Sequence, residues 1–279
     1  MSGTLWIVGT PIGNRDDISS RAIEVLYHVE YIVAEDTRVT RVLLSALGIY
    51  EKKLLSLYDH VELEKSEKIF SLLLEGREIA LVSDAGMPCI SDPGYVLVRR
   101  CHQHNIPVRV VPGASSITTL LAGSGIPAIP CTFLGFLPRG RGERIRTFEQ
   151  YLPINTSLVF FERKNRVVES LSLAYEVLGE REVCVGRELT KQYEEYIHCM
   201  LSSDMSHLGT LQGEVTVIIG KSEHGYRTPL EEVVSLYASL SGEKSIRQEV
   251  KELQSKVYGY SAKELYTRIV EYKNKRNEE

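Results

Sequence analysis

The sequence lacks any long hydrophobic run. No stretch approaches the roughly 18 apolar residues that a membrane-spanning helix needs. The first residues lead directly into a strand-like segment, without the basic and apolar pattern of a secretory signal. Because 43% of the residues are hydrophobic and 25% are charged, a disordered or fibrous chain is disfavoured. We therefore predict a cytoplasmic protein, with no membrane contact, that is long enough for two domains.

Paired cysteines and an excess of basic residues are also missing. The five cysteines are an odd number, are widely scattered and form no C-x-x-C motif, and no histidines stand at metal-ligand spacing. This pattern predicts reduced thiols and no metal site. The formal net charge of −4 argues weakly against a nucleic-acid partner, because phosphate binding depends on Lys and Arg. The local distribution of charge must decide that question.

The first half of the chain alternates short apolar runs with stretches of helical period, which is typical of βα units on a largely parallel sheet. The expected strands are Leu5–Gly9, Tyr31–Ala34, Leu54–Leu57, Ile79–Ser83 and Val108–Val111. The expected helices are Ile18–Val29, Val39–Leu47, Lys65–Leu74 and Tyr95–His104.

The stretch from Ser124 to Pro130 is dense in Gly and Pro and is the expected interdomain linker. The second half could be a mixed sheet, because Glu195–Leu201 follows the preceding strand too closely for a crossover helix. We expect an N-terminal α/β domain over residues 1–124, a C-terminal α/β domain over 125–225 and a helical tail over 226–279. The further strands are Thr132–Phe136, Ser157–Phe161, Val183–Arg187, Glu195–Leu201 and Val215–Gly220, and the further helices are Glu143–Tyr151, Val167–Leu178, Leu230–Ser239, Ile246–Tyr258 and Ala262–Tyr272.

Three polar or glycine-rich loops follow expected strands, where open parallel sheets bind ligands. The loop Gly9–Asn14 is neither G-x-G-x-x-G nor a phosphate-binding P-loop, so it indicates a site without naming a cofactor. The stretch Ser83–Gly94 combines carboxylates, hydroxyls and glycines that can bind ribose hydroxyls or an ammonium group. Within this stretch, Asp92 has an alternative role as a helix N-cap. The third loop is Pro112–Ser116, and its Ser115 has the same alternative role.

Five motifs occur in order along the chain: Thr10–Asn14, Ala34–Arg38, Ser83–Gly94, Pro112–Ser115 and Gly186–Lys191. This set resembles the bacterial 16S ribosomal RNA cytidine 2′-O-methyltransferase family, a branch of the tetrapyrrole methylase superfamily. The resemblance covers residues 4 to about 221. Two segments depart from it: Glu162–Arg166 stands where the family usually has Glu-Ser-Pro-His-Arg, and Met87-Pro88-Cys89 where it usually has Thr-Pro-Gly.

The resemblance implies two α/β domains of the tetrapyrrole methylase type with S-adenosylmethionine in a cleft between them, and a small helical C-terminal appendage. It also implies a homodimer and a cytidine in the decoding region of 16S rRNA, in the 30S subunit, as the target. The expected cofactor-binding residues are Pro11, Ser83, Asp84, Ala85, Gly86, Ile90, Ser91, Asp92, Ser115, Ser116 and Phe161.

Methylation of a ribose hydroxyl also requires the removal of one proton, by a general base or with the help of a cation that stabilises the alkoxide. The candidates lie in or beside motifs at expected strand ends, and each has a structural role as its alternative. They are Asp36, His60, Glu188 and Lys191.

Local charge favours an RNA partner. From Lys244 to Arg276 there are nine Lys or Arg against four Glu, a balance of +5, and a second basic segment follows Phe136-Leu137-Pro138. Such clusters fit phosphate contacts, although a solvated helix face with ion pairs at i,i+4 explains them as well. The expected RNA-binding residues are Arg38, Arg139, Arg141 and Arg144.

Two rival interpretations remain. One is a methylase of the same fold that acts on a tetrapyrrole-like small molecule or on a protein side chain. The other is a catalytically silent RNA-binding protein that keeps the fold but does not bind S-adenosylmethionine.

Overall fold

A five-stranded, all-parallel sheet forms the N-terminal part of the protein. The computed structural model describes residues 2–57, 62–223, 225–240 and 245–278. The strand order is β3-β2-β4-β1-β5, so the expected parallel α/β architecture is confirmed. The strands are β1 (Leu5–Val8), β2 (Tyr31–Ala34), β3 (Lys53–Ser56), β4 (Ile79–Val82) and β5 (Val108–Val111), and the helices are α1 (Ser20–His28), α2 (Thr37–Ala46), α3 (Glu62–Leu74) and α4 (Tyr95–Gln103), with a 3₁₀ turn η1 at Arg15–Asp17.

Helices cover both faces of this sheet. Alternate strand residues point to opposite sides, so each strand contributes side chains to the cores on both faces. On one face, Leu5 and Ile79 pack with the apolar sides of α3 and α4. On the other, Val8, Ala80 and Val82 pack with α1 and α2. The fully buried strand β4 (Ile79–Val82) is therefore apolar at every position, and its carboxyl end delivers Ser83 and Asp84 to the edge of the sheet.

The second sheet is mixed, as its sequence spacing indicated, with the order β6-β7-β10-β8-β9. Strands β6 and β7 are parallel, whereas β10 is antiparallel to both β7 and β8, and β8 pairs antiparallel with β9. The elements are β6 (Cys131–Phe136), α6 (Arg141–Tyr151), β7 (Ser157–Glu162), α7 (Val167–Leu178), β8 (Glu182–Arg187), β9 (Glu195–Met200), the 3₁₀ turn η3 (Ser206–Leu208) and β10 (Val215–Ile219).

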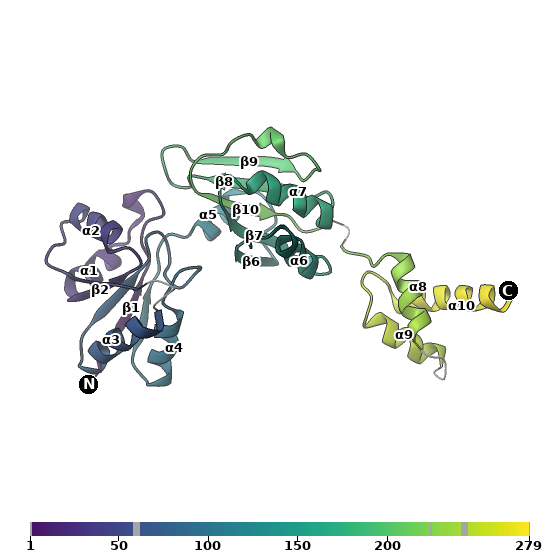
Figure 1. Ribbon diagram of the computed structural model, residues 1–279, viewed down its shortest axis with the longest axis horizontal. Coiled ribbons are helices and arrows are strands. Elements are labelled where there is room, and N and C mark those ends of the chain that lie inside the picture. Colours follow the sequence, from purple (N-terminus) through teal and green to yellow (C-terminus); the bar gives the residue numbers. More distant parts are fainter. Residues whose placement is uncertain (1, 58–61, 224, 241–244, 279) are drawn as a thin grey trace.

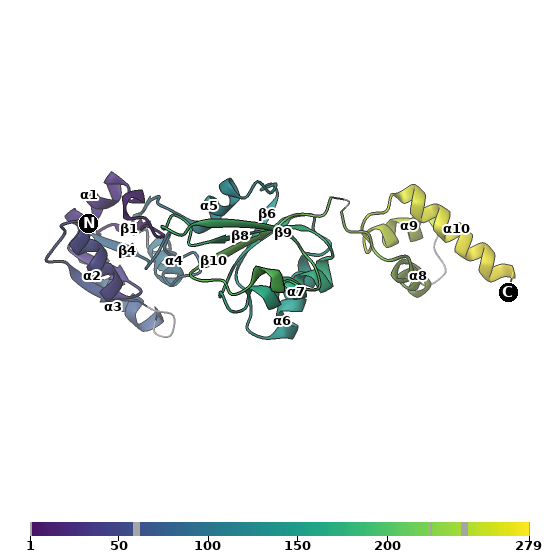
Figure 2. The ribbon, with the colours of Figure 1, turned by 90° about the horizontal axis from the view of Figure 1, so that it is seen from above.

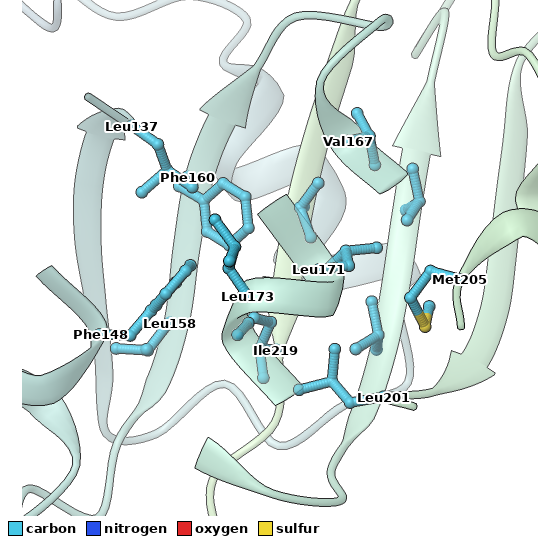
Figure 3. Close-up of a cluster of buried hydrophobic side chains, with 14 of the residues drawn as sticks. Leu137, Phe148, Leu158, Phe160, Val167, Leu171, Leu173, Leu201, Met205 and Ile219 are labelled. Atoms are coloured by element: carbon cyan, nitrogen blue, oxygen red, sulfur yellow. The ribbon is translucent and has the colours of Figure 1, made fainter. Parts of the chain in front are cut away.

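Helices α6 and α7 cover one face of the second sheet, and α5 (Ser116–Gly123) lies against the other. The larger core lies under α6 and α7, where Phe148, Phe160 and Leu171 are fully buried (Figure 3). On the opposite face, Leu120 of α5 packs with Val159 and with Ile218 of β10. Helix α5 therefore packs with the second sheet, although the sequence interpretation places it before the interdomain boundary.

Three helices form the C-terminal unit: α8 (Leu230–Ser239), α9 (Ile246–Gln254) and α10 (Ala262–Glu278). They share a small core of their own that includes Val233, Val250, Leu253 and Leu265. Both views show this unit apart from the two sheets, at the end of a connecting segment (Figures 1 and 2). None of the helices in the described parts of the chain is both long and apolar enough to cross a lipid bilayer.

Local capping sets the start of two helices. Helix α4 begins at Tyr95, as expected, but its N-cap residue is Gly94 at φ 127° and not Asp92. A Cβ atom at position 94 would lie 2.6 Å from Leu81 Cδ2 and 2.8 Å from Cys89 Sγ, so this position accepts only glycine. Helix α1 begins at Ser20, because the side chain of Ser19 accepts a hydrogen bond from the Ala22 N–H and caps it there.

Candidate active site

A cavity of about 700 Å³ lies where the carboxyl ends of the first sheet meet the second sheet. Its wall is contributed by the β4–α4 loop, the first turn of α5, the end of β7 and the segment before and along β10. The lining residues are Ile12, Asp84, Ala85, Gly86, Met87, Ile90, Ser91, Asp92, Ser115, Ser116, Ile117, Phe136, Phe161, Glu162, Arg163, Lys164, Asn165, Leu189, Gly213, Glu214, Val215 and Thr216. We call this space the interdomain cavity.

All of the expected cofactor-binding residues except Pro11 and Ser83 line the interdomain cavity. Ser83 is buried and donates a hydrogen bond to the Gly86 carbonyl oxygen over 3.1 Å, so it shapes the loop from behind. Pro11 does not line the cavity, whereas the next residue, Ile12, does. Neither Pro11 nor Ser83 lines the cavity directly, so their assignment to the cofactor stays a prediction.

The loops after β1 and β4 are joined by their backbones. Thr10 and Gly86 exchange two N–H···O bonds of 2.9 and 3.2 Å, and the Thr10 hydroxyl donates to the Ser83 carbonyl oxygen. Gly86 has φ 83°, and a Cβ atom there would lie 3.2 Å from Ile12 Cγ2. A glycine is thus required where the chain turns into the cavity, and the backbone of the loop forms part of the wall.

The N-terminus of α5 also opens into the interdomain cavity. Ser115 is the N-cap residue, but its side chain makes no capping hydrogen bond. The N–H groups of the first helical turn have no intrahelical acceptors and carry the positive end of the helix dipole. Together with the hydroxyls of Ser115 and Ser116, they form a place where a ligand carboxylate binds favourably.

Aromatic rings form the opposite, apolar wall. The ring of Phe161 at the end of β7 packs 5.0 Å from Phe133 and 5.2 Å from Phe136, measured between centroids. Ile90 and Met87 from the β4–α4 loop line the same cavity. An adenine ring can stack or pack on such a surface, since aromatic and aliphatic side chains line most small-molecule sites.

Most of the residues that the second sheet contributes to the wall of the interdomain cavity were not among the expected cofactor-binding residues. Residues 162–165 and 213–216 line the cavity because β7 and β10 are neighbours in the mixed sheet. Nothing local in the segment from Gly213 to Thr216 distinguishes it from an ordinary strand start. The polar run after β7 is a signal that strand-end reasoning can recognise, although only Phe161 was chosen from this region.

A buried ion pair supports the cavity wall from behind. The Glu162 side chain has no exposed surface and lies 2.8 Å from an Arg166 guanidinium nitrogen. Its carboxylate also accepts hydrogen bonds from the Ser170 hydroxyl and the Arg163 N–H. Arg166 in turn donates to the carbonyl oxygens of Leu137 and Pro138. The ion pair therefore connects the end of β7, the start of α7 and the loop after β6.

A second, polar cavity of about 430 Å³ lies at the carboxyl ends of β2, β3 and β4 and shares Asp84 with the first. Asp36 and Arg38 form a salt bridge of 2.6 Å at its edge, and the Asp36 carboxylate also accepts the Arg38 N–H. These hydrogen bonds lower the pKa of Asp36 to about 2. Its lining residues are Glu35, Asp36, Thr37, Arg38, Ser56 and Asp84, and we call it the polar cavity.

Lys191 lies between two carboxylates, 3.0 Å from Glu188 Oε1 and 3.0 Å from Glu214 Oε2. Burial lowers the pKa of Lys191, but these two hydrogen bonds and charges outweigh it and raise the pKa above its usual value. The Glu214 N–H and Lys191 lower the pKa of Glu188. Lys191 therefore stays protonated and is engaged with protein carboxylates, and only Glu214 of the three lines the interdomain cavity.

The expected RNA-contacting arginines differ in their surroundings. Arg139 and Arg38 are exposed, and Arg141 is an exposed partner of Glu176 at 2.9 Å. Arg144 is only 2% exposed and binds Glu169 and Ser170, so its assignment as a phosphate contact is wrong. The helical period of α6 turns position 144 toward α7 and away from solvent.

The remaining expectations concern His60 and metals. His60 lies outside the described residues, so its role as a base stays a prediction. In the parts of the chain that the structure describes, no three or more His, Cys, Asp or Glu side chains form a group that could hold a metal ion.

Sequence comparison relates this chain to known methyltransferases. The family model for tetrapyrrole (corrin/porphyrin) methylases matches residues 4–203. A ribosomal RNA small subunit methyltransferase I of Thermotoga maritima is 44% identical over 223 residues, 79% of this chain and all of the relative. The protein of the same name from Mesorhizobium japonicum is 38% identical over 97% of this chain and 92% of its own length.

Solved structures with a similar fold belong to methyltransferases too. The structure of the methyltransferase CobJ has a TM-score of 0.62 at 17% identity and covers 82% of this chain and 97% of its own. A uroporphyrin-III-C-methyltransferase from Thermus thermophilus has a TM-score of 0.56 at 18% identity, over 86% of this chain and all of its own. At these identities the similarity shows a common fold.

Proposed function

Because the chain belongs to the ribosomal RNA small subunit methyltransferase I family, within the tetrapyrrole methylases, we propose that it methylates the ribose 2′-hydroxyl of a cytidine in 16S ribosomal RNA, with S-adenosylmethionine as methyl donor. The chain is a methyltransferase of this family, and its two α/β sheets agree with that membership. The proposal depends above all on the identity of 38–44% to relatives of one name over most of the chain.

The interdomain cavity fits the donor in size and chemistry. A volume of about 700 Å³ lies within the usual range of small-molecule sites. Phe161 and Ile90 offer an apolar wall for an adenine ring, and the first turn of α5 offers N–H groups and hydroxyls for a carboxylate. Ser91 and Asp92 supply oxygen atoms for ribose hydroxyls or an ammonium group.

When bound, S-adenosylmethionine supplies a methyl group that its sulfonium sulfur has already activated. The protein must then orient a ribose oxygen toward that carbon and accept one proton, and orientation alone contributes several kcal/mol. The joined loops of β1 and β4 and the ion pair behind β7 hold the walls of the interdomain cavity in fixed positions. A rigid wall favours a constant orientation of the ribose oxygen relative to the methyl carbon.

A transfer assay tests the function. Purified protein is incubated with S-adenosylmethionine that carries a labelled methyl group and with 30S subunits from cells without this gene. We expect label in 16S rRNA, and 2′-O-methylcytidine after nuclease digestion and mass spectrometry. Label on the base, or on a porphyrinoid offered in parallel, would contradict the proposed acceptor. Light scattering of the same preparation checks the homodimer that the resemblance implies.

The exposed arginines beside β6 give a prediction for RNA binding. We expect the double change Arg139→Ala and Arg141→Ala to weaken binding to 30S subunits several-fold without changing the affinity for S-adenosylmethionine. Each lost phosphate contact reduces the slope of log affinity against log salt by about one. Filter binding across a salt series measures both quantities.

A matched pair on the first sheet provides the control. Arg99→Ala with Arg109→Ala removes the same charge from exposed positions on α4 and β5. If this control lowers 30S affinity and salt slope as much as the first pair, the effect is one of net charge and the segment 139–141 is no RNA contact.

A further inference from the structure

Asp84 is the residue that the two cavities share. Among the described residues that line them, Asp84 alone belongs to both linings. The sheet order explains why: β4 lies between β2 and β1, so its carboxyl end borders the polar cavity on one side and the interdomain cavity on the other. A group at this boundary faces donor and acceptor at once if each occupies one cavity.

We propose that the polar cavity receives the acceptor ribose and that Asp84 is the general base that takes its 2′-hydroxyl proton. This inference rests on the proposed function and deepens it. The 2′-oxygen forms its bond to the methyl carbon while the carbon–sulfur bond breaks, and the pair of electrons from that bond remains on sulfur. The proton passes to the Asp84 carboxylate and from there to solvent.

The hydrogen bonds of Asp84 leave one carboxylate oxygen available. Oδ1 accepts the backbone N–H of Asp36 over 3.1 Å, which fixes the orientation of the carboxyl group. For Oδ2 the described part of the chain offers no hydrogen-bond partner. Burial is the main reason that the pKa of Asp84 is raised above its usual value, and the negative charge of Asp36 raises it further. The hydrogen bond from the Asp36 N–H and the positive charge of Arg38 lower this pKa, but they do not cancel the rise. A carboxylate with a raised pKa is a better proton acceptor than an ordinary one.

The other carboxylates near the boundary are less suited. Asp36 has both oxygens in contact with the Arg38 guanidinium, and its pKa of about 2 makes it a weak base. Glu162 is fully buried and accepts hydrogen bonds from Arg166, Ser170 and Arg163. Glu214 is paired with Lys191. Asp84 is therefore better suited to proton transfer than these three carboxylates, and it is the described carboxylate that lines both cavities.

The hydroxyls and charges of the polar cavity suit a nucleotide. Thr37 and Ser56 line it with hydroxyl groups, and the largely exposed Arg38 at its rim is within reach of a backbone phosphate. Arg38, which the sequence assigned to RNA, and Asp84, which it assigned to the cofactor cleft, thus line the same polar cavity. The two motifs follow β2 and β4, which are neighbours in the sheet.

The test is the substitution Asp84→Asn, which keeps the shape of the side chain and an acceptor for the Asp36 N–H. We expect kcat for methylation of 30S subunits to fall by at least about 100-fold, the size of a general-base contribution. We also expect the Kd for S-adenosylmethionine, from titration calorimetry, and the affinity for 30S subunits to change by less than about threefold. Asp17→Asn, at an exposed position of the turn η1, controls for the substitution itself.

The pH profile distinguishes a base from a structural carboxylate. In the wild type, kcat should fall as the pH decreases through the pKa of Asp84, because the protonated form cannot accept a proton. Asp84→Asn should remove this acidic limb. Asp36→Asn should keep the limb and move it to lower pH, since the charge of Asp36 raises the pKa of Asp84. The other charged residues that line the two cavities are Glu35, Asp36, Arg38, Asp92, Glu162, Arg163, Lys164 and Glu214.

Three results would overturn the inference while the wild type remains active: near-normal kcat in Asp84→Asn, an acidic limb that persists in that variant, or a limb that disappears in Asp36→Asn. Loss of S-adenosylmethionine binding by Asp84→Asn would also overturn it, because Asp84 would then anchor the donor. An inactive wild type on 30S subunits would instead contradict the proposed function, so the two failures are distinguishable.

Discussion

Replacing Glu162 by alanine is expected to destabilise the protein by about 3 kcal/mol, the lower end of the range for removing one partner of a buried ion pair. The Arg166 charge would lose its only carboxylate in the described structure, and the Ser170 hydroxyl and Arg163 N–H would lose an acceptor. Arg166 Nε already has no partner among the described residues, so the guanidinium would be poorly compensated. Differential scanning calorimetry measures the loss.

Glu176→Ala is the matched control for this prediction. Its carboxylate pairs with Arg141 at 2.9 Å, but both side chains are more than half exposed. Exposed pairs contribute about 0–1 kcal/mol, so this variant should unfold close to the wild type. Equal destabilisation by the two variants would contradict the role of the Glu162–Arg166 pair. Donor affinity should fall only in Glu162→Ala, because Glu162 forms part of the cavity wall.

Most of the architecture could be predicted from apolar periodicity. The strands of the first sheet are short, apolar and separated by helical stretches, so their existence and parallel direction follow from pattern alone. The mixed second sheet followed from the close spacing of β8 and β9. The start of α4 at Tyr95 was predictable, but its N-cap was not: the N-cap is Gly94 and not Asp92, and only the packing against Leu81 and Cys89 shows why glycine is needed there.

The site was predictable where motifs follow the strands of a parallel sheet. Asp84, Gly86 and Ser115 could be placed at one edge because parallel strands end together. The segment from Gly213 to Thr216 could not, since its position depends on β10 pairing with β7, far away in the sequence. The burial of Arg144 depends likewise on the packing of α6 against α7. Pairwise tertiary contacts of this kind leave no local mark in a sequence.

Gly13→Ala is expected to weaken S-adenosylmethionine binding about tenfold through the contact between the two sheets. The loop after β1 touches the segment after β8 here: a Cβ atom at position 13 would lie 2.3 Å from Lys191 Cγ and 3.1 Å from the Leu189 carbonyl oxygen. The Asn14 N–H also donates to the Thr190 hydroxyl. Gly13 does not have a positive φ, so alanine is disfavoured by the contact and not by its backbone conformation.

Lys191 cannot easily move aside, because its ammonium group is held by Glu188 and Glu214. The added methyl group should therefore push the two loops apart, at a cost of about 1–3 kcal/mol for overpacking. Ile12 and Leu189 lie in these loops and line the interdomain cavity, so their displacement alters the donor site.

Titration calorimetry of donor binding, with a thermal melt of each variant, checks the Gly13→Ala prediction. Gly142→Ala is the control, because a Cβ atom at this position on α6 meets nothing within 4 Å. It should keep donor affinity and raise stability by about 0.5–1 kcal/mol, as expected for alanine in place of glycine in a helix. If Gly13→Ala binds the donor like the wild type and melts at the same temperature, the close approach of the two loops does not determine the shape of the cavity.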